Sequence, residues 1–384
     1  MSEHGTPWGE WAQLASDTIA MKPVKGIPAG TVFAMDVPFM EQTAGHRPGD
    51  YANDPVGIYV AFQKLAGTCF VDQFIPTNPL SMGAHGYISS TPKGATTGLD
   101  SILCDGMEID SPEAVIEHLE KIIFPRRQQE IADWPAKEQA FVDRIISEER
   151  QVQETLGRNI LKGPYFFAFP YLSYGTYGYT NYFMAYALYP EVMARDFATQ
   201  ADLATLKNHA IAKAIVQAHL PHLLRLDHDM ADGRGTLVDV KSLDAIWFPH
   251  FERSIQPLLK AGIRLTWHCD GNLMAMVPRL IGCGVSGFQG FQYEYGMDYE
   301  KICRMKDRNG NSLLIIAGVS VTRTLPWGRP DDVRREMKWL VENGPAVGLF
   351  LGASSSITPG VPHENLHAFI EGLHYYRNAG RGQA

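Results

Sequence analysis

The chain has 384 residues and a formal net charge of −8. Apolar residues make up 45% of it and charged residues 20%, which is typical of a globular protein and excludes a disordered chain. The sequence contains no long run of Lys and Arg, so we expect no nucleic-acid surface. It also contains no apolar stretch long enough to span a membrane.

The cysteines indicate a reducing compartment. Their number is odd, no CxxC pair occurs, and the polar segment Met1–Trp11 lacks the basic start and apolar run of a secretory signal. Free thiols in a large chain are typical of a cytoplasmic protein. The five cysteines are Cys69, Cys104, Cys269, Cys283 and Cys303.

The first half of the chain has an irregular pattern. Thr31–Asp36 and Cys69–Ile75 have the composition of strands, and Val56–Leu65 between them has the spacing of a helix. Ser111–Ile123 and Ala136–Leu156 have the spacing of exposed amphipathic helices.

From about Thr205 onward, short apolar strands alternate with helices. This alternation predicts parallel βαβ units and leaves two architectures open, a closed barrel and a doubly wound sheet. The expected strands are Leu223–Leu226, Ile263–Trp267, Gly287–Gln292, Leu313–Ala317 and Gly348–Leu351. The expected helices are Lys241–Ala261, Leu273–Cys283, Tyr299–Lys306, Pro330–Glu342 and Pro362–Arg377.

Polar side chains follow several of these strands. In parallel α/β architectures such positions carry the catalytic groups, and in a closed barrel they converge on one mouth. Each of these polar residues could instead have a purely structural role, such as capping a turn. We expect the side chain of Asp227 to face outward. The predicted catalytic residues are Asp72, Asp229, His268, Asp270 and Glu294.

An aromatic-rich segment extends from Tyr165 to Phe183, with ten aromatic residues among nineteen. Such a surface suits a flat organic ligand, although ordinary core packing is an equal alternative. Glycines flank Tyr177 and Tyr179, which we therefore predict to line the ligand site. A GxSxG nucleophile elbow, a P-loop and a convincing GxGxxG after a strand are all absent, which weakens hydrolase, NTPase and Rossmann interpretations.

The segments Trp267–Asn272 and Ile357–Asn365, together with Gly284, Gly287 and Gly296–Asp298, resemble the uroporphyrinogen decarboxylase and cobalamin-dependent methyltransferase superfamily. The resemblance implies an α/β fold, a (β/α)8 TIM barrel with extra N-terminal helices. It further implies a single domain over residues 1–384, with helical decoration at about residues 111–156 and the active site at the carboxyl ends of the strands.

Two departures from the family pattern bear on the chemistry. The decarboxylases carry an arginine-rich segment near the N-terminus, whereas residues 22–38 contain no arginine, and their late histidine is Ser355 here. The thiol-activating methyltransferases bind zinc through a His-x-Cys pair and a later Cys. This chain has His268-x-Asp270 and again Ser355, which weakens thiol activation. A metal site, zinc included, built from His268, Asp270 and Glu294 stays open.

The remaining branch implies a methyltransferase of the O-demethylase type. It would pass a methyl group from a methylated small molecule, a methoxylated aromatic above all, to the cobalt of a corrinoid (cobalamin) on a partner protein. The alternatives are a decarboxylase of a cyclic or aromatic acid, in which Asp72 would stabilise a protonated ring, and a non-catalytic small-molecule binding module. A homodimer is also left open.

The demethylase hypothesis assigns roles to the predicted residues. His268 or Asp270 would polarise or protonate the leaving atom, and Asp229 and Glu294 would orient it. The predicted substrate contacts are Tyr177, Tyr179, Asn272 and Ser355.

Overall fold

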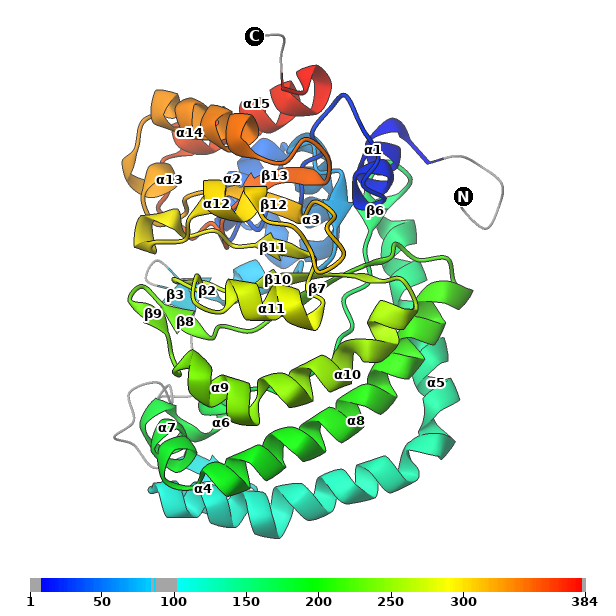
Figure 1. Ribbon diagram of the computed structural model, residues 1–384. Coiled ribbons are helices and arrows are strands. Elements are labelled where there is room, and N and C mark those ends of the chain that lie inside the picture. The colour runs from blue at the N-terminus through cyan, green and yellow to red at the C-terminus, as the bar shows by residue number, and fades with distance from the viewer. Residues whose placement is uncertain (1–7, 84–85, 88–101, 382–384) are drawn as a thin grey trace.

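The computed structural model describes residues 8–83, 86–87 and 102–381. Its centre is a five-stranded parallel sheet in which neighbouring strands follow one another along the chain, apart from a short hairpin inserted between two of them (Figure 1). The strand order is β13 (Leu349–Ala353), β12 (Leu314–Val319), β11 (Gly287–Gln289), β10 (Arg264–His268) and β7 (Leu223–Asp227). The predicted parallel βαβ pattern of the second half is therefore confirmed.

Two further parallel strands come from the first half of the chain. β1 (Phe70–Val71) pairs with β6 (Leu161–Lys162). Single parallel bridges connect Ala29 to Thr68, just before β1, and to Leu351 in β13. Within the described ranges no bridge joins β6 to β7, so the parallel sheet is confirmed and the closed ring of eight strands stays a prediction. The remaining strands form antiparallel pairs, β2 (Met82–Gly83) with β3 (Gly86–Tyr87), β4 (Ile102–Cys104) with β5 (Met107–Ile109), and β8 (Ala231–Asp232) with β9 (Gly235–Thr236).

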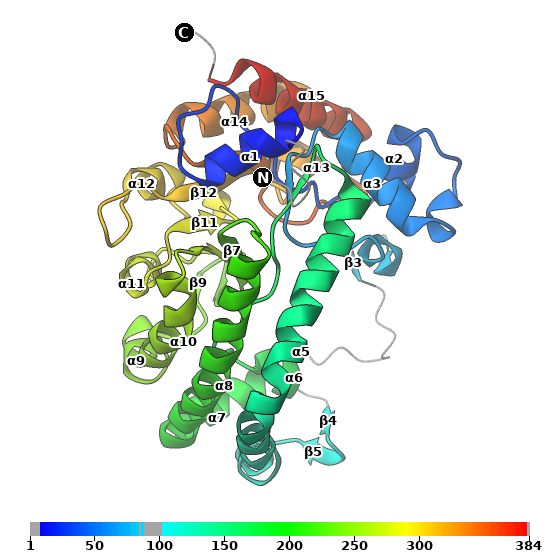
Figure 2. The same ribbon diagram turned by 90° about the vertical axis from the view of Figure 1, so that its right-hand side faces the viewer.

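Helices surround the sheet and extend well below it (Figures 1 and 2). Those that follow the sheet strands are α9 (Val240–Ile246), α10 (Phe248–Lys260), α11 (Val277–Cys283), α12 (Tyr299–Arg304), α13 (Thr324–Trp327), α14 (Pro330–Asn343) and α15 (His363–Ala379). The earlier ones are α1 (Glu10–Ile19), α2 (Val37–Thr43), α3 (Pro55–Leu65), α4 (Pro112–His118), α5 (Phe124–Leu156), α6 (Tyr174–Tyr177), α7 (Tyr179–Leu188) and α8 (Pro190–Gln217). The short turns are η1 (Asp50–Ala52), η2 (Asn78–Ser81), the π-helical η3 (Leu119–Ile123) and η4 (Tyr293–Tyr295).

The prediction of a strand at Thr31–Asp36 is wrong. This stretch contains one isolated bridge, from Ala34 to Ile357, and joins no ladder. The side chain of Gln63 takes the place of a neighbouring strand, because it accepts from the backbone N–H of Val32 (3.2 Å) and donates to its carbonyl (2.8 Å). A buried amide can satisfy extended backbone in this way without a sheet.

The two longest helices pack along each other. α8 lies between α5 and α10, so apolar residues cover more than one of its faces (Figure 2). α5 bends along its length in Figure 1 and contains Pro135, which removes a backbone hydrogen bond and kinks a helix.

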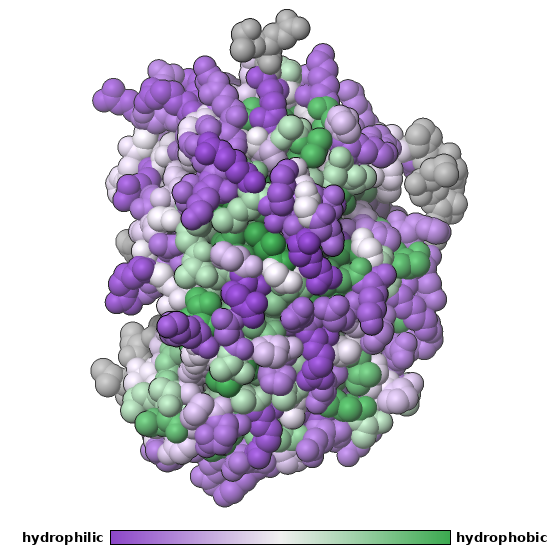
Figure 3. Space-filling model, in the orientation of Figure 1, coloured by the Kyte–Doolittle hydropathy of each residue, from purple (hydrophilic) through white to green (hydrophobic). Residues whose placement is uncertain are grey.

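Figure 3 shows a mostly hydrophilic outer face with separate small apolar patches. None of the described helices combines the length and apolar character that crossing a bilayer needs. A single domain over residues 1–384 stays a prediction.

One apolar cluster connects α1 with the strands. Ala12, Ala15 and Ile19 of α1 pack with inward-facing residues near the amino-terminal ends of several parallel strands. These residues are Phe70, Leu161, Leu223, Leu314, Ile316 and Phe350, together with Cys69 directly before β1. Burial of this apolar area from water stabilises the contact between helix and sheet.

Replacing Phe350 by Ala should therefore destabilise the fold. The ring is fully buried and lies 5.5 Å from that of Phe70, centroid to centroid. Its loss leaves a cavity, which costs about 3–5 kcal/mol of the free energy of unfolding. Urea denaturation measures this, and the control Phe350→Leu should lose less than half as much. Equal losses for the two variants would contradict the cluster's role.

Candidate active site

Two neighbouring strands bring three ionisable side chains together at their carboxyl ends. β7 ends at Asp227 and β10 ends at His268, and these two residues pair in the ladder. Asp229 and Asp270 each follow two residues later. One nitrogen or oxygen atom from each of Asp229, His268 and Asp270 lies within 4.8 Å of the others. We call these three residues the acid–imidazole cluster.

Hydrogen bonds fix the two carboxylates of the cluster. The backbone N–H of Asp270 donates to Oδ1 of Asp229 (2.8 Å). Ser355, after β13, donates through Oγ to Oδ2 of Asp270 (3.1 Å), and Gln292, after β11, donates through Nε2 to Oδ1 (3.2 Å). Side chains from four strand ends thus meet here. Ser355 was predicted as a substrate contact, whereas Gln292 was not predicted.

The imidazole of His268 is buried, and its Nδ1 has no hydrogen-bond partner among the residues that the structure describes. Gly290 packs directly against it, since a Cβ at that position would lie 2.5 Å from Nδ1, and its φ of +87° also favours glycine. A buried polar atom without a partner costs free energy, so it points to a group that completes the site.

The donor set of the cluster fits a divalent metal ion. Burial raises the pKa of Asp270, Asp229 nearby raises it further, and His268 opposes this effect. A cation between the two carboxylates would relieve their repulsion. Imidazole and carboxylate ligands suit ions such as Zn²⁺, Fe²⁺ or Mn²⁺.

Cys269 supplies no sulfur ligand to this set. Its Sγ accepts from the backbone N–H of Met230 (3.3 Å) and donates to the carbonyl of Asp270 (2.9 Å). Burial raises the pKa of the thiol well above its ordinary value, so the thiolate that a metal requires is disfavoured. The three-residue cluster therefore offers oxygen and nitrogen ligands.

A buried arginine connects Asp72 to this region. Nε of Arg225 donates to Oδ2 of Asp72 (2.6 Å) and Nη1 donates to Oδ2 of Asp227 (2.6 Å). Nη2 donates to Gln73 (3.1 Å), and the hydroxyl of Tyr165 donates to the same Asp227 oxygen (3.0 Å). The Asp72 carboxylate is therefore paired with the guanidinium of Arg225 beside the acid–imidazole cluster and is not a member of that cluster.

The expectation that Asp227 faces outward is wrong. Burial would raise its pKa, but His268, Arg225 and Tyr165 together lower it, so the side chain stays ionised beside His268. Residues two apart in a strand share a face. The arginine at the third position of the apolar run 223–226 was thus a sequence signal for an inward pair of Arg225 and Asp227.

Glu294 lies at the neighbouring strand end and is engaged elsewhere. Its Oε1 accepts from the hydroxyls of Ser320 (2.7 Å) and Thr322. Asn272 shapes the loop after β10. Its side-chain Oδ1 accepts from the backbone N–H of Met274 (3.2 Å), and its backbone N–H donates to the carbonyl of Asp232 (2.8 Å). The structure does not bring either predicted residue into the acid–imidazole cluster.

The aromatic segment reaches the cluster through Tyr174. Its hydroxyl donates to the carbonyl of Asp229 (2.7 Å), and its ring lies nearly parallel to that of His228 at 5.7 Å. Burial lowers the pKa of His228 to about 4, so this ring is neutral. Tyr179 packs on Tyr174 with ring centroids 4.6 Å apart and is 38% exposed.

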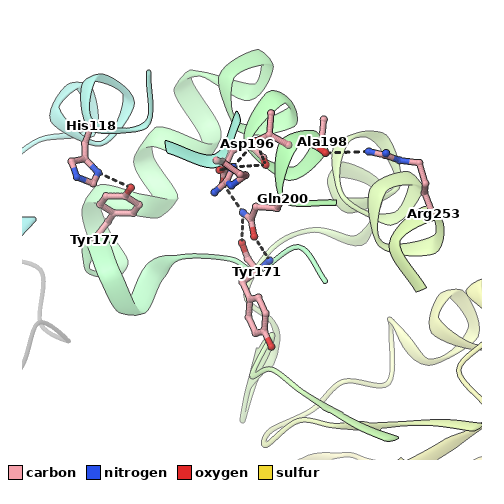
Figure 4. A network of polar contacts seen from close by, with 9 residues as sticks. His118, Tyr171, Tyr177, Asp196, Ala198, Gln200 and Arg253 are labelled. Atoms are coloured by element: carbon pink, nitrogen blue, oxygen red, sulfur yellow. Dashed lines mark hydrogen bonds and ion pairs between the residues drawn. The ribbon is translucent and has the colours of Figure 1, made fainter. Parts of the chain in front are cut away.

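Tyr177 lies apart from these residues. It is buried, and its hydroxyl forms a 2.9 Å hydrogen bond with Nδ1 of His118 on α4 (Figure 4). Figure 4 also shows Gln200 of α8 holding the backbone of Tyr171, which anchors the aromatic segment to the helices. Of the flanking glycines that suggested Tyr177, Gly175 lies within α6 and Gly178 separates α6 from α7.

Comparison with solved structures gives the fold a relative. A methyltransferase from Methanosarcina mazei matches 97% of this chain and 99% of its own, with a TM-score of 0.57 and 15% sequence identity. The likeness confirms the sequence resemblance at the level of the fold. A B12-independent methionine synthase from Shewanella sp. W3-18-1 matches 62% of this chain and 65% of its own, with 13% identity. Its TM-score of 0.32 is too low to indicate a shared fold. No family model and no curated protein matches.

Removing the charge of Asp72 should destabilise the protein, because Arg225 would remain buried with a single carboxylate partner. Breaking one side of a buried ion pair costs about 3 kcal/mol. We therefore expect Asp72→Asn to lower the free energy of unfolding in urea by about that amount. Asp331→Asn removes an exposed partner of Arg334 and should change it by less than about 0.5 kcal/mol. Equal effects of the two substitutions would contradict the assignment.

Glu336 of α14 accepts a hydrogen bond from the backbone N–H of Ser320 (2.6 Å). Burial raises its pKa to about 7 in the folded state, against 4.5 ordinarily. At the Glu336 carboxyl group the folded protein therefore binds a proton more readily than the unfolded chain does. The contribution of this proton to the free energy of unfolding is complete below about pH 4.5 and is lost as the pH rises through 7.

Glu336→Gln removes this titration and can still accept the hydrogen bond. The free energy of unfolding, measured by urea at pH values between 4.5 and 8, should fall less with rising pH in the variant than in the wild type. The difference should reach up to about 3 kcal/mol. Parallel pH profiles for the two proteins would show that Glu336 does not titrate with a raised pKa.

Proposed function

We propose that this protein is a methyltransferase that takes the methyl group from a methylated small molecule, a methoxylated aromatic compound, and passes it to the cobalt of a corrinoid on a separate protein. The observation that carries this proposal is the acid–imidazole cluster, which lies at the carboxyl ends of parallel strands in a fold similar to that of a methyltransferase. Active sites of such folds lie at this end.

The proposal includes a closed barrel. Three observations support ring closure around β1, β6 and the five-stranded sheet. Ala29 bridges β13 to the chain before β1. The cluster under α1 draws side chains from both groups of strands. A small cavity of about 20 Å³ is bordered from several strands at once, by Thr31, Phe70, Asp72, Arg225, Gln289, Ile316 and Gly352 among others.

The chemistry follows from the leaving group. Demethylation of an ether releases an alkoxide or phenoxide, which leaves poorly unless its negative charge is stabilised. A divalent ion held by Asp229, His268 and Asp270 would act as a Lewis acid on that oxygen. Ser355 and Gln292 hold Asp270 in place for this role. Hydrogen bonds of this kind place the side chains that bind a metal ion precisely.

The residues around the cluster would orient the substrate. Tyr174 and the neutral ring of His228 stand beside Asp229 and offer flat apolar area to an aromatic ring. Tyr179, on the outer side of Tyr174, extends this surface toward solvent. Holding the ring there would direct its methyl group away from the cluster, toward an incoming acceptor.

The corrinoid partner would approach the same end of the strands. Residues after β12, β11 and β7 expose large side chains there: Trp327 is 84% exposed, Tyr295 is 41% exposed, and the side chain of Arg234 is 92% exposed. Trp, Tyr and Arg are the residue types that dominate protein–protein binding energy.

The decarboxylase alternative is less well supported. It requires the carboxylate of Asp72 to face a protonated ring. Oδ2 of Asp72 instead accepts from Arg225, and Oδ1 accepts from the backbone N–H of Gln73 (2.6 Å). Both oxygens are therefore engaged within the protein.

Methyl transfer can be tested by adding the full-length protein to a reduced corrinoid protein with a panel of methoxylated aromatics, while the cobalt absorption spectrum is recorded. We expect conversion of the reduced to the methylated spectrum with at least one donor. His268→Ala should slow it by at least ~100-fold because the cluster loses its imidazole. His209→Ala, an exposed residue of α8, is the matched control and should leave the rate unchanged. An unchanged cobalt spectrum with every donor would contradict the proposed function.

A further inference from the structure

A second pocket lies at the amino-terminal ends of the strands, opposite the acid–imidazole cluster. Figure 1 shows α1 at this end and the β8–β9 hairpin at the other. The pocket has a volume of about 360 Å³, within the range of small-molecule sites. Its lining includes Trp8, Ile19, Leu161, His219, His222 and Arg264.

Arg264, the first residue of β10, is the charged group of this pocket. Its backbone N–H donates to the carbonyl of His222 (3.0 Å), but its guanidinium forms no hydrogen bond or ion pair with the residues that the structure describes. The side chain is half-buried, and burial lowers its pKa while Asp307 opposes this. A half-buried guanidinium without a hydrogen-bond partner in the described protein keeps its donors open to a ligand that enters the pocket.

The rest of the lining matches an anion with an apolar body. His219 and His222 are exposed and can donate hydrogen bonds beside Arg264. Ile19 and Leu161 are buried apolar residues that offer an adjoining wall. The lining contains no Asp or Glu, in contrast to the acid–imidazole cluster with its two carboxylates. The two ends of the strands therefore favour ligands of opposite charge.

We propose that this pocket binds a small organic carboxylate, with Arg264 as its anchor. The planar guanidinium matches a carboxylate through two parallel N–H···O bonds, which a lysine ammonium cannot reproduce. The hydrocarbon part of the ligand packs on Trp8, Ile19 and Leu161. Because this site lies at the other end of the strands, it is separate from the proposed catalytic centre and does not depend on the proposed function.

Calorimetric titration of the full-length protein with benzoate tests the site, with benzamide as the neutral ligand of the same shape. We expect benzoate to bind and benzamide to bind at least ~10-fold more weakly, since only the former forms charge-assisted hydrogen bonds. Arg264→Gln should weaken benzoate binding by at least ~10-fold, and Arg264→Lys should lie between the two.

Two control variants keep the result interpretable. Arg335→Gln removes an exposed arginine of α14 and should bind benzoate as the wild type does. His268→Ala alters the other end of the strands and should also bind it normally. Benzoate binding that survives Arg264→Gln but disappears in His268→Ala would assign the ligand to the acid–imidazole cluster and overturn the proposal. Equal binding of benzoate and benzamide would overturn it as well. Matching urea denaturation curves establish that each variant is folded.

Discussion

The buried guanidinium of Arg225 is the interaction on which the arrangement of the strand ends depends. It joins Asp72 beyond β1 to Asp227 at the end of β7, two segments that are 155 positions apart in the chain. A buried arginine is tolerated only if its donors are paired, so both carboxylates must turn inward. The consequence is an ionised Asp227 beside His268 and a carboxylate of Asp72 that is occupied by the protein itself. Under the proposed function, the reacting groups are instead Asp229, His268 and Asp270.

The residues of the cluster differ from the zinc-binding pattern of the thiol-activating methyltransferases that the sequence resembles. Asp270 stands where that pattern has a cysteine, and Ser355 stands where it has a second one. The structure uses Ser355 to hold Asp270 and adds Asp229 from the neighbouring strand. In the proposed function, oxygen ligands would keep a bound metal ion a stronger Lewis acid toward oxygen, which would suit an ether substrate better than a thiol.

Sequence periodicity predicted the second half of the fold because each strand there is a short apolar run ended by polar residues. It failed at residues 31–36, where Gln63 satisfies the backbone in place of a strand, and it missed α8, whose apolar residues are spread over two packed faces. Convergence of Asp229, His268, Asp270 and Ser355 followed from the rule that parallel strands end together. Tyr177 and Tyr174 could not be distinguished, because the direction of a ring depends on the packing of α6 and α7 against distant helices.

The most direct measurement is Co²⁺ binding to the metal-free, full-length protein, followed by its absorption spectrum. Occupation of the acid–imidazole cluster predicts one tightly bound Co²⁺ per chain, with the weak bands of oxygen and nitrogen ligands and without an intense thiolate charge-transfer band. His268→Ala should weaken this binding by at least ~10-fold. A spectrum with thiolate bands, or binding that is the same in wild type and His268→Ala, would contradict a metal centre built from Asp229, His268 and Asp270.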